Sequence, residues 1–500
     1  MALEERMSLF PTLADHARLV AMRDCSAAVN RLSGQYVVLS PVAGAVLAMC
    51  NGSISLERIV RICSESLPRS LGVDQHYVAQ ALEKCEAYLV WNPTPRETDW
   101  KYHPPDFLSE PRPKAGYRNL PLEKPLVMTL VLTNRCNQRC VYCFRAAGPK
   151  WQGEFSRDEV FAVIEQAAEM GLKHCSLTGG EPTLHADFVD IVVRMLERDI
   201  YPYVSTNGTC VSEADLSELR AAGLETIQFS LDAGTRELYE RMVGVGGHFD
   251  RVLDAIAAAK RLGFTVRVKG VVTALNSQGI GDLFAVCAER GVDYVFVEAF
   301  SPGLRGRGSR ELLVPHEVAV EVQSAVEQAR ERFSSRMTIP PFTVPGKWAG
   351  PDNIIYCGGM YSSFIVQPDG TVCACEQVCE PALCFGNVRE HPLAELWGSE
   401  RVLRFLNPDL SNVPEPCRSC EQLSHCRTGC FNYSLQYSDE LYSPDPRCWK
   451  VDLGQDNPLL LDEQPAATPP VARTSAPSAL RARPCGQVET WNTRPVAGSP

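Results

Sequence analysis

The sequence "TNRCNQRCVYCFR", residues 133–145, places three cysteines in one short loop with the spacing C-x3-C-x2-C. They are Cys136, Cys140 and Cys143, and the run "LVMTLVLT" just before them predicts a buried strand. A structural zinc site would normally add a fourth Cys or His nearby, and none lies close in the sequence. Either a distant cysteine completes the set of ligands or one coordination position stays open. A structural zinc site is the alternative to a metal centre with such an open position.

Strand-like and helix-like segments alternate outward from this loop, through residues 123–330. The strand "HCSLTGGEP" is followed by the helix "FVDIVVRMLERD", and the strand "PYVSTNG" by the helix "ADLSELRAAG". Such repeats predict an α/β fold with a parallel sheet, curled or open, whose active site lies at the carboxyl ends of the strands.

The composition of the whole chain narrows the class of protein. Its 500 residues, 45% of them hydrophobic, predict two to four globular units. The chain has no run of 18 apolar residues and no signal-peptide pattern, so we expect a cytoplasmic protein that binds no membrane. A net charge of −11 argues against nucleic acid as a partner. Twenty-one cysteines in such a chain indicate metal ligands rather than disulfides.

Polar motifs follow three predicted strands after the cysteine loop. In "LTGGEP" the glycines allow close approach of the backbone to a ligand, and a carboxylate such as Glu181 can pair with an ammonium group. "STNG" and "SLDAG" follow the next two strands, and either alone is an ordinary turn sequence. The candidate residues at these strand ends are Gly179, Gly180, Glu181, Pro182, Ser205, Asn207, Ser230 and Asp232.

A second group of cysteines lies in a C-terminal segment that is dense in Cys, Gly and Pro. The segment has few apolar residues, so bound metal would have to stabilise it. A zinc ribbon is the alternative, because C-x2-C and C-x3-C pairs also suit zinc. The group consists of Cys357, Cys375, Cys417, Cys420, Cys426, Cys430 and Cys448.

The first motif resembles the signature of the radical S-adenosylmethionine (SAM) superfamily, with Tyr142 as the aromatic residue before the third cysteine. The resemblance implies a partial (β/α)6 barrel and a [4Fe-4S] cluster whose open iron chelates SAM. It also implies that "GGEP" serves the methionine amino group and that the other strand-end residues surround the cofactor. Reductive cleavage would then give a 5′-deoxyadenosyl radical that abstracts hydrogen from a C–H bond. The electron would come from a low-potential donor such as ferredoxin or flavodoxin.

The C-terminal pattern resembles the SPASM extension of these enzymes, which binds two auxiliary [4Fe-4S] clusters. The resemblance assigns Cys417, Cys420, Cys426 and Cys448 to one cluster. It assigns Cys357, Cys375 and Cys430 to the other, whose fourth ligand could be Cys373, Cys379 or Cys384, or could be absent. Glu376 follows Cys375 where related sulfatase maturases carry an acidic catalytic residue, and so is a candidate acid or base.

Residues 15–97 resemble PqqD-like peptide-recognition domains, through "GQYVVLSPVAGAVLAMCNGSISLERIV". The resemblance implies a small winged-helix-like unit that binds the leader of a precursor peptide as an added strand. A DNA-binding winged helix is the alternative, but the segment has no basic stripe. We expect a linker at 98–122, the radical SAM domain at 123–330, the SPASM domain at 331–452 and a disordered tail at 453–500.

Together the resemblances imply an enzyme that oxidatively modifies a ribosomally made peptide, by a thioether or carbon–carbon crosslink or a related change. A maturase of a protein or small molecule is the second interpretation. The third is an iron-sulfur protein that only transfers electrons or serves as a scaffold, against which "GGEP" and the open cluster argue.

Overall fold

The structure is a computed structural model. It describes residues 3–67, 73–97, 100–108, 119–149, 153–301, 303, 305, 309–342, 357–377, 380–438, 440–448, 450 and 451. The predicted tail, much of the predicted linker and Cys379 lie outside the described residues. In the part that is described, no helix combines the length and the apolar character that crossing a membrane requires.

Six parallel strands form the centre of the molecule, and the predicted α/β class is confirmed. They lie side by side in chain order, so each strand pairs with the next along the sequence. Alternate residues of β10 point to opposite faces, with Val266, Val268 and Val272 buried. The strands are β6 (Val127–Val131), β7 (His174–Thr178), β8 (Tyr201–Thr206), β9 (Thr226–Ser230), β10 (Thr265–Val272) and β11 (Tyr294–Ala299).

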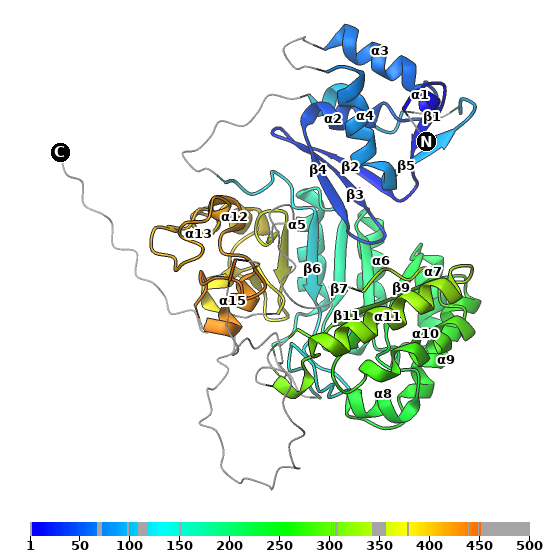
Figure 1. Cartoon of the computed structure of the whole chain (residues 1–500), viewed down its shortest axis with the longest axis vertical. Coiled ribbons are helices and arrows are strands. Elements are labelled where there is room, and N and C mark those ends of the chain that lie inside the picture. Colours follow the sequence, from blue (N-terminus) through cyan, green and yellow to red (C-terminus); the bar gives the residue numbers. More distant parts are fainter. Residues whose placement is uncertain are drawn as a thin grey trace, which may run out of the picture.

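Helices connect these strands and cover one side of the sheet (Figure 1). Capping boxes begin two of them, at Ser156 with Glu159 and at Ser212 with Asp215. Their apolar faces and the sheet share one large hydrophobic core, so the barrel is stable through packing. The helices are α5 (Arg157–Glu169), α6 (Phe188–Glu197), α7 (Glu213–Ala221), α8 (Arg236–Val243), α9 (Phe249–Arg261), α10 (Ile280–Glu289) and α11 (His316–Phe333).

The C-terminal region continues the same sheet, which the sequence analysis did not predict. Strand β12 (Ser363–Val366) pairs in parallel with β6, and β13 (Thr371–Cys373) and β14 (Cys384–Asn387) follow as antiparallel neighbours. The cysteine-rich region is therefore built directly onto the first strand of the barrel. Its helices are α12 (Leu393–Trp397), α13 (Glu400–Leu406), α14 (Leu423–Cys426) and α15 (Phe431–Ser438).

The N-terminal unit has its own core, with one antiparallel sheet in the order β2-β3-β4 and a second pair, β1-β5. The predicted strand in "GQYVVLSP" is β4, and Ser55 caps α3. Within "HYVAQALEKCEAYLVW" the helix ends at Lys84, and a strand begins at Leu89. The elements are α1 (Leu3–Arg6), β1 (Phe10–Leu13), β2 (Ala17–Ala21), β3 (Ser26–Asn30), β4 (Tyr36–Leu39), α2 (Pro41–Ala48), α3 (Leu56–Ser66), α4 (Gln75–Lys84) and β5 (Leu89–Asn92).

The turn between β3 and β4 rests on the amino ends of the barrel strands (Figure 1). The carbonyl oxygen of Arg31 lies 2.8 Å from His174 Nδ1, and the Arg31 guanidinium forms an ion pair with Glu225 at 2.5 Å. On the same side, the hydroxyls of Tyr36 and Ser362 are 2.5 Å apart. The N-terminal unit therefore sits at the end of the barrel opposite to the cysteine loop.

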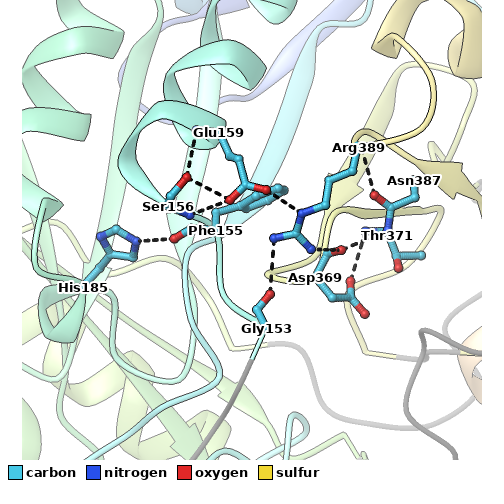
Figure 2. A network of polar contacts seen from close by, with 9 residues as sticks. All are labelled: Gly153, Phe155, Ser156, Glu159, His185, Asp369, Thr371, Asn387 and Arg389. Carbon is cyan, nitrogen blue, oxygen red and sulfur yellow. Dashed lines mark hydrogen bonds and ion pairs between the residues drawn. The ribbon is translucent and has the colours of Figure 1, made fainter.

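Arg389 joins the β13–β14 hairpin to the first helix of the barrel (Figure 2). Its Nε donates to Glu159 at 2.6 Å, and its Nη1 donates to the carbonyl oxygen of Asp369 at 2.6 Å. The guanidinium also lies over the ring of Phe155. This contact fixes the cysteine-rich region beside the loop that follows Gly153.

Candidate functional site

The cysteine loop is fixed to the motif that follows the neighbouring strand. Gly180 N donates to the Thr133 carbonyl at 2.6 Å, and Glu181 N donates to the Arg135 carbonyl at 2.8 Å. A Cβ on Gly180 would collide with that same Arg135 carbonyl oxygen. "GGEP" therefore needs its glycines because the backbone of the cysteine loop lies directly against it.

The other side of the loop is held by α8 and by Arg305. Arg139 N donates to Val243 O at 2.9 Å, and Val141 N donates to Met242 O at 3.0 Å. Arg305 donates to the carbonyl oxygen of Cys140 at 3.1 Å. The loop is thus anchored along its length at the carboxyl end of the sheet, where the sequence predicted the active site.

Of the loop cysteines, Cys136 is buried, whereas Cys140 and Cys143 are partly buried. Burial raises the pKa of the Cys136 thiol to about 12 and that of Cys140 well above its usual value. Iron-sulfur ligation requires thiolates, so assembly of a cluster must release these protons, and the positive charge of iron offsets the cost of burial.

Glu181 is 1% exposed and lies at the centre of a hydrogen-bond network. Its carboxylate accepts hydrogen bonds from Thr183 N and Oγ1, from Thr206 Oγ1 at 2.6 Å and from Asn207 N at 2.7 Å. Burial raises the pKa of Glu181, while these donors lower it. The carboxylate thus joins the ends of β7 and β8, and its contact with an ammonium group stays a prediction.

The other strand-end residues lie on neighbouring strands of the same sheet. Asn207 Nδ2 donates to Asn137 Oδ1, in the cysteine loop, at 2.9 Å. Ser205 accepts from Gln228 Nε2 at 2.8 Å, and Ser230 ends β9 beside Lys269 of β10. Asn207 is therefore tied directly to the loop. Pro182 begins the short turn after Glu181.

Asp232 positions the tyrosine of the cysteine motif. Tyr142 Oη donates to Asp232 Oδ2 at 2.5 Å, and Val271 N donates to Oδ1 at 2.8 Å. Burial raises the pKa of Asp232 to about 6, whereas the Tyr142 bond lowers it. Asn276 is fully buried and bonds to the backbone around Asp232 and Thr273, so in this structure it shapes the turn.

The C-terminal cysteines form two neighbouring groups, and their assignment to two clusters stays a prediction. Burial raises the pKa of the Cys375 thiol to about 12, and the nearby thiols of Cys357 and Cys430 add to that rise. Burial likewise raises the pKa of the Cys417 thiol to about 12, with its neighbours adding to the rise. Those neighbours are Cys420, Cys426 and Cys448.

The buried carboxylate of Asp445 lies between these two sets. It accepts from Cys430 N at 2.8 Å and from the Arg447 guanidinium at 2.8 and 3.0 Å. Since Cys430 belongs to one set and Cys448 closely follows Arg447, this pair holds the ends of both sets in place.

Two of the candidate fourth ligands face each other. Cys373 and Cys384 are paired across β13 and β14, with 3.5 Å between their sulfur atoms. Cys375 lies close enough to Cys373 to raise its pKa. The fourth ligand of that auxiliary cluster can therefore still be Cys373, Cys379 or Cys384, or it can be absent.

Arg145 links the cysteine loop to the C-terminal region, which the sequence analysis missed. Its side chain is 5% exposed, with Nη2 at 3.4 Å from Glu376 and Nη1 at 3.3 Å from Gln367. Gln138, between two of the loop cysteines, was also missed, and it donates to Tyr239 Oη at 3.1 Å. No sequence signal links these residues, because their partners are about 100 or more positions away.

The donor chemistry fits iron-sulfur clusters. Within the described residues, no three His, Cys, Asp or Glu side chains form a group that could hold a single metal ion. A cubane spreads its thiolates over four irons, so it needs the thiols as neighbours but not at one point.

Family models match both halves of this site. The model of the radical SAM superfamily matches residues 130–286, and that of an iron-sulfur cluster-binding domain, SPASM, matches residues 357–421. The chain therefore contains a radical SAM domain and a SPASM domain. The predicted radical SAM and SPASM resemblances are confirmed, and the six parallel strands are a partial radical SAM barrel.

Curated relatives of this chain include PqqA peptide cyclases. That of Granulibacter bethesdensis is 28% identical over 332 residues, covering 65% of this chain and 88% of the relative. That of Rhizobium meliloti is 27% identical over 347 residues, covering 68% and 92%. Among solved structures, Streptococcus suis SuiB bound to S-adenosylmethionine has a TM-score of 0.62 at 16% identity, covering 88% of this chain and all of SuiB. At that identity the likeness shows the fold.

Proposed function

We propose that this radical SAM enzyme oxidatively modifies a ribosomally made precursor peptide. The observation that carries the proposal is the combination of a cysteine loop fixed to "GGEP" with two C-terminal cysteine sets beside it. The relatives support a peptide as substrate, since they are named PqqA peptide cyclases, and SuiB has been solved with its precursor peptide SuiA.

Each group of residues has a part in this chemistry. When bound, a [4Fe-4S] cluster at Cys136, Cys140 and Cys143 supplies the electron that cleaves SAM to a 5′-deoxyadenosyl radical. The backbone around Gly180 and the network of Glu181 place the methionine end of SAM at this loop, and Asp232 fixes Tyr142 beside it. Auxiliary clusters held by the C-terminal cysteines would take up the second electron or bind the substrate.

Glu376 is our candidate for the acid or base. Its side chain is 40% exposed, so it can meet a substrate, and it directly follows the cluster ligand Cys375. Its role would be to accept the proton that leaves the peptide as the second electron departs.

The N-terminal unit would bind the leader at the outer edge of β4, where no further strand pairs within the described part of the chain. Of the two edges of its sheet, the β2 edge is partly occupied, because Leu19 N donates to Tyr102 Oη at 3.1 Å. The β4 edge carries Val38, an apolar side chain that is 39% exposed. An added strand there would gain main-chain hydrogen bonds and cover Val38.

Strand β12 spans the distance from this edge to the cysteine loop. Ser362, just before β12, contacts Tyr36 of β4, and Gln367, just after it, contacts Arg145. Five extended residues cover about 17 Å, so a leader bound at β4 needs a spacer of about five residues or more to reach the loop.

The test is the intact mass of short peptides encoded beside the gene, each co-expressed anaerobically with the enzyme. We expect one peptide to lose two hydrogen masses. No change in any peptide, with SAM still cleaved, would move the proposal to a protein or small-molecule substrate.

The leader site has a separate test in the full-length chain. Val38→Lys should weaken binding of that peptide about tenfold, because it places a charge where an apolar side chain would be covered. Val90→Lys is the matched control, since Val90 is 43% exposed on β5 of the other sheet. Equal effects of both variants would contradict the β4 site.

A further inference from the structure

Arg145 is a buried cation without full compensation. Its side chain is 5% exposed, and a buried guanidinium is costly unless its five donors are paired. Its contacts to Gln367 and Glu376, at 3.3 and 3.4 Å, are longer than a typical charge-assisted hydrogen bond of about 2.8 Å. Its Nε is buried and has no hydrogen-bond partner in the part of the chain that the structure describes.

This cation lies between thiols of two different sites. Arg145 follows Cys143 by two residues in the cysteine loop, and its partner Glu376 directly follows Cys375 of an auxiliary set. Burial lowers the pKa of Arg145, whereas Glu376 and the thiols of Cys143, Cys375 and Cys373 raise it. The electric field of the guanidinium therefore acts on these thiols in surroundings of low dielectric constant.

We propose that Arg145 and Glu376 act as opposed charges that set the reduction potential of the auxiliary cluster at Cys357, Cys375 and Cys430. Reduction adds one negative charge to a cluster. The cation therefore favours the reduced form and raises the potential, and the carboxylate opposes it. Arg145 is thus a positioning and tuning residue of the cluster.

The inference rests on the proposed function, in which that cluster receives the second electron. The peptide loses one hydrogen atom to the 5′-deoxyadenosyl radical. One electron then passes from the peptide radical to the oxidised cluster, and a proton leaves to a base. The closer the potential of the cluster is to that of the radical, the smaller the driving force of this transfer, so Arg145 keeps the cluster an effective acceptor.

The test is a redox titration of the reconstituted full-length enzyme, followed by electron paramagnetic resonance without peptide. Arg145→Gln should lower the midpoint potential of this cluster, and Glu376→Gln should raise it. Each change should alter the equilibrium constant for one-electron reduction about tenfold, which is 59 mV. The double variant should return towards the wild-type value, and Arg145→Lys should shift less than Arg145→Gln.

Arg389→Gln is the control, since that arginine binds Glu159 of α5 and is 34% exposed, so it should leave the potential unchanged. A variant that also replaces Cys136, Cys140 and Cys143 by Ala assigns the signals of the auxiliary clusters. If Arg145→Gln loses its cluster, Glu376→Gln and Arg145→Lys still test the sign. Equal potentials, or shifts of both single variants in one direction, would overturn the inference. Because no peptide is present, that result would leave the proposed substrate untouched.

Discussion

The cysteine loop of residues 133–148 and the C-terminal segment of residues 409–448 offer the same ligand atoms but are built in opposite ways. The loop is bonded through its backbone to Gly180, Glu181 and the end of α8, and these elements belong to the large core of the barrel. In the described part of the segment the helices have only four and eight residues. Its buried hydrophobic residues there are Val413, Cys417 and Phe431, and Leu435, Leu441 and Tyr442 are partly buried against the large core.

The difference indicates what bound metal contributes in each place. Because backbone hydrogen bonds hold the loop to the barrel, we expect it to keep its shape without a cluster, so that a cluster there would add chemistry rather than stability. The C-terminal segment buries too few apolar groups to be stable alone, so its cluster supplies part of the folding free energy.

Single cysteine variants give the largest expected contrast. Cys140→Ala should reduce 5′-deoxyadenosine release to background, because the cluster that reduces SAM loses one of three ligands. Cys426→Ala should retain SAM cleavage but lose the modified peptide, as measured by chromatography and mass spectrometry. Cys287→Ala, in the core on α10, is the control and should keep both products. Persistent 5′-deoxyadenosine from Cys140→Ala would contradict the assignment of the loop.

Removal of the clusters should make the C-terminal segment, but not the barrel, accessible to protease. Trypsin should cut the cluster-free protein at Arg427, which is 4% exposed in the folded chain, while residues 153–300 stay intact. Losing about 3 kcal/mol of local stability would raise the cutting rate about 100-fold. Mass spectrometry of the fragments at successive times measures this. Simultaneous cleavage of the barrel would show that the loop region also depends on its cluster.

Matched glycine substitutions compare the backbone beside the cysteine loop with that of the C-terminal segment. Gly180→Ala forces a Cβ against the Arg135 carbonyl, and we expect SAM cleavage to fall about tenfold or more. Gly429→Ala places a Cβ against Asp445 at a φ of +101°, so it should disturb the C-terminal set alone. Iron content and the rate of 5′-deoxyadenosine release separate the two outcomes. A loss of SAM cleavage in Gly429→Ala as large as in Gly180→Ala would mean that the regions are coupled.

The contact between Glu159 of α5 and Arg389 of the C-terminal region gives the smallest expected effect on stability. Glu159 accepts a hydrogen bond from Arg389, which lowers the pKa of Glu159 to about 2. A depressed pKa stabilises the protein above the ordinary carboxyl pKa of about 4.3, and that contribution is lost as the pH falls towards 2. Glu159 is 38% exposed, so Glu159→Gln should cost about 1 kcal/mol or less at pH 7 and less at pH 4.

Urea unfolding of the cluster-free protein at the two pH values measures this cost. Arg389→Gln is the matched variant and should show the same pH dependence, since it removes the other half of the same pair. A cost that grows as the pH falls would contradict the pairing.

The sequence predicted what local patterns encode. The strand before Cys136, the helix in "FVDIVVRMLERD" and the strand that ends in "STNG" all lie where periodicity placed them. It did not predict that β12 pairs with β6, because that contact joins residues more than 230 positions apart. Arg145 was missed for the same reason, since only the folded chain brings Gln367 and Glu376 to it.

The most direct test of peptide radical chemistry is transfer of deuterium from the peptide to 5′-deoxyadenosine. The peptide that changes mass on co-expression would be prepared with deuterated amino acids and incubated anaerobically with the reduced enzyme and SAM. We predict that the released 5′-deoxyadenosine carries deuterium as the peptide loses two hydrogen-isotope atoms. Modified peptide with 5′-deoxyadenosine free of deuterium would contradict hydrogen abstraction from the peptide's carbon-bound positions.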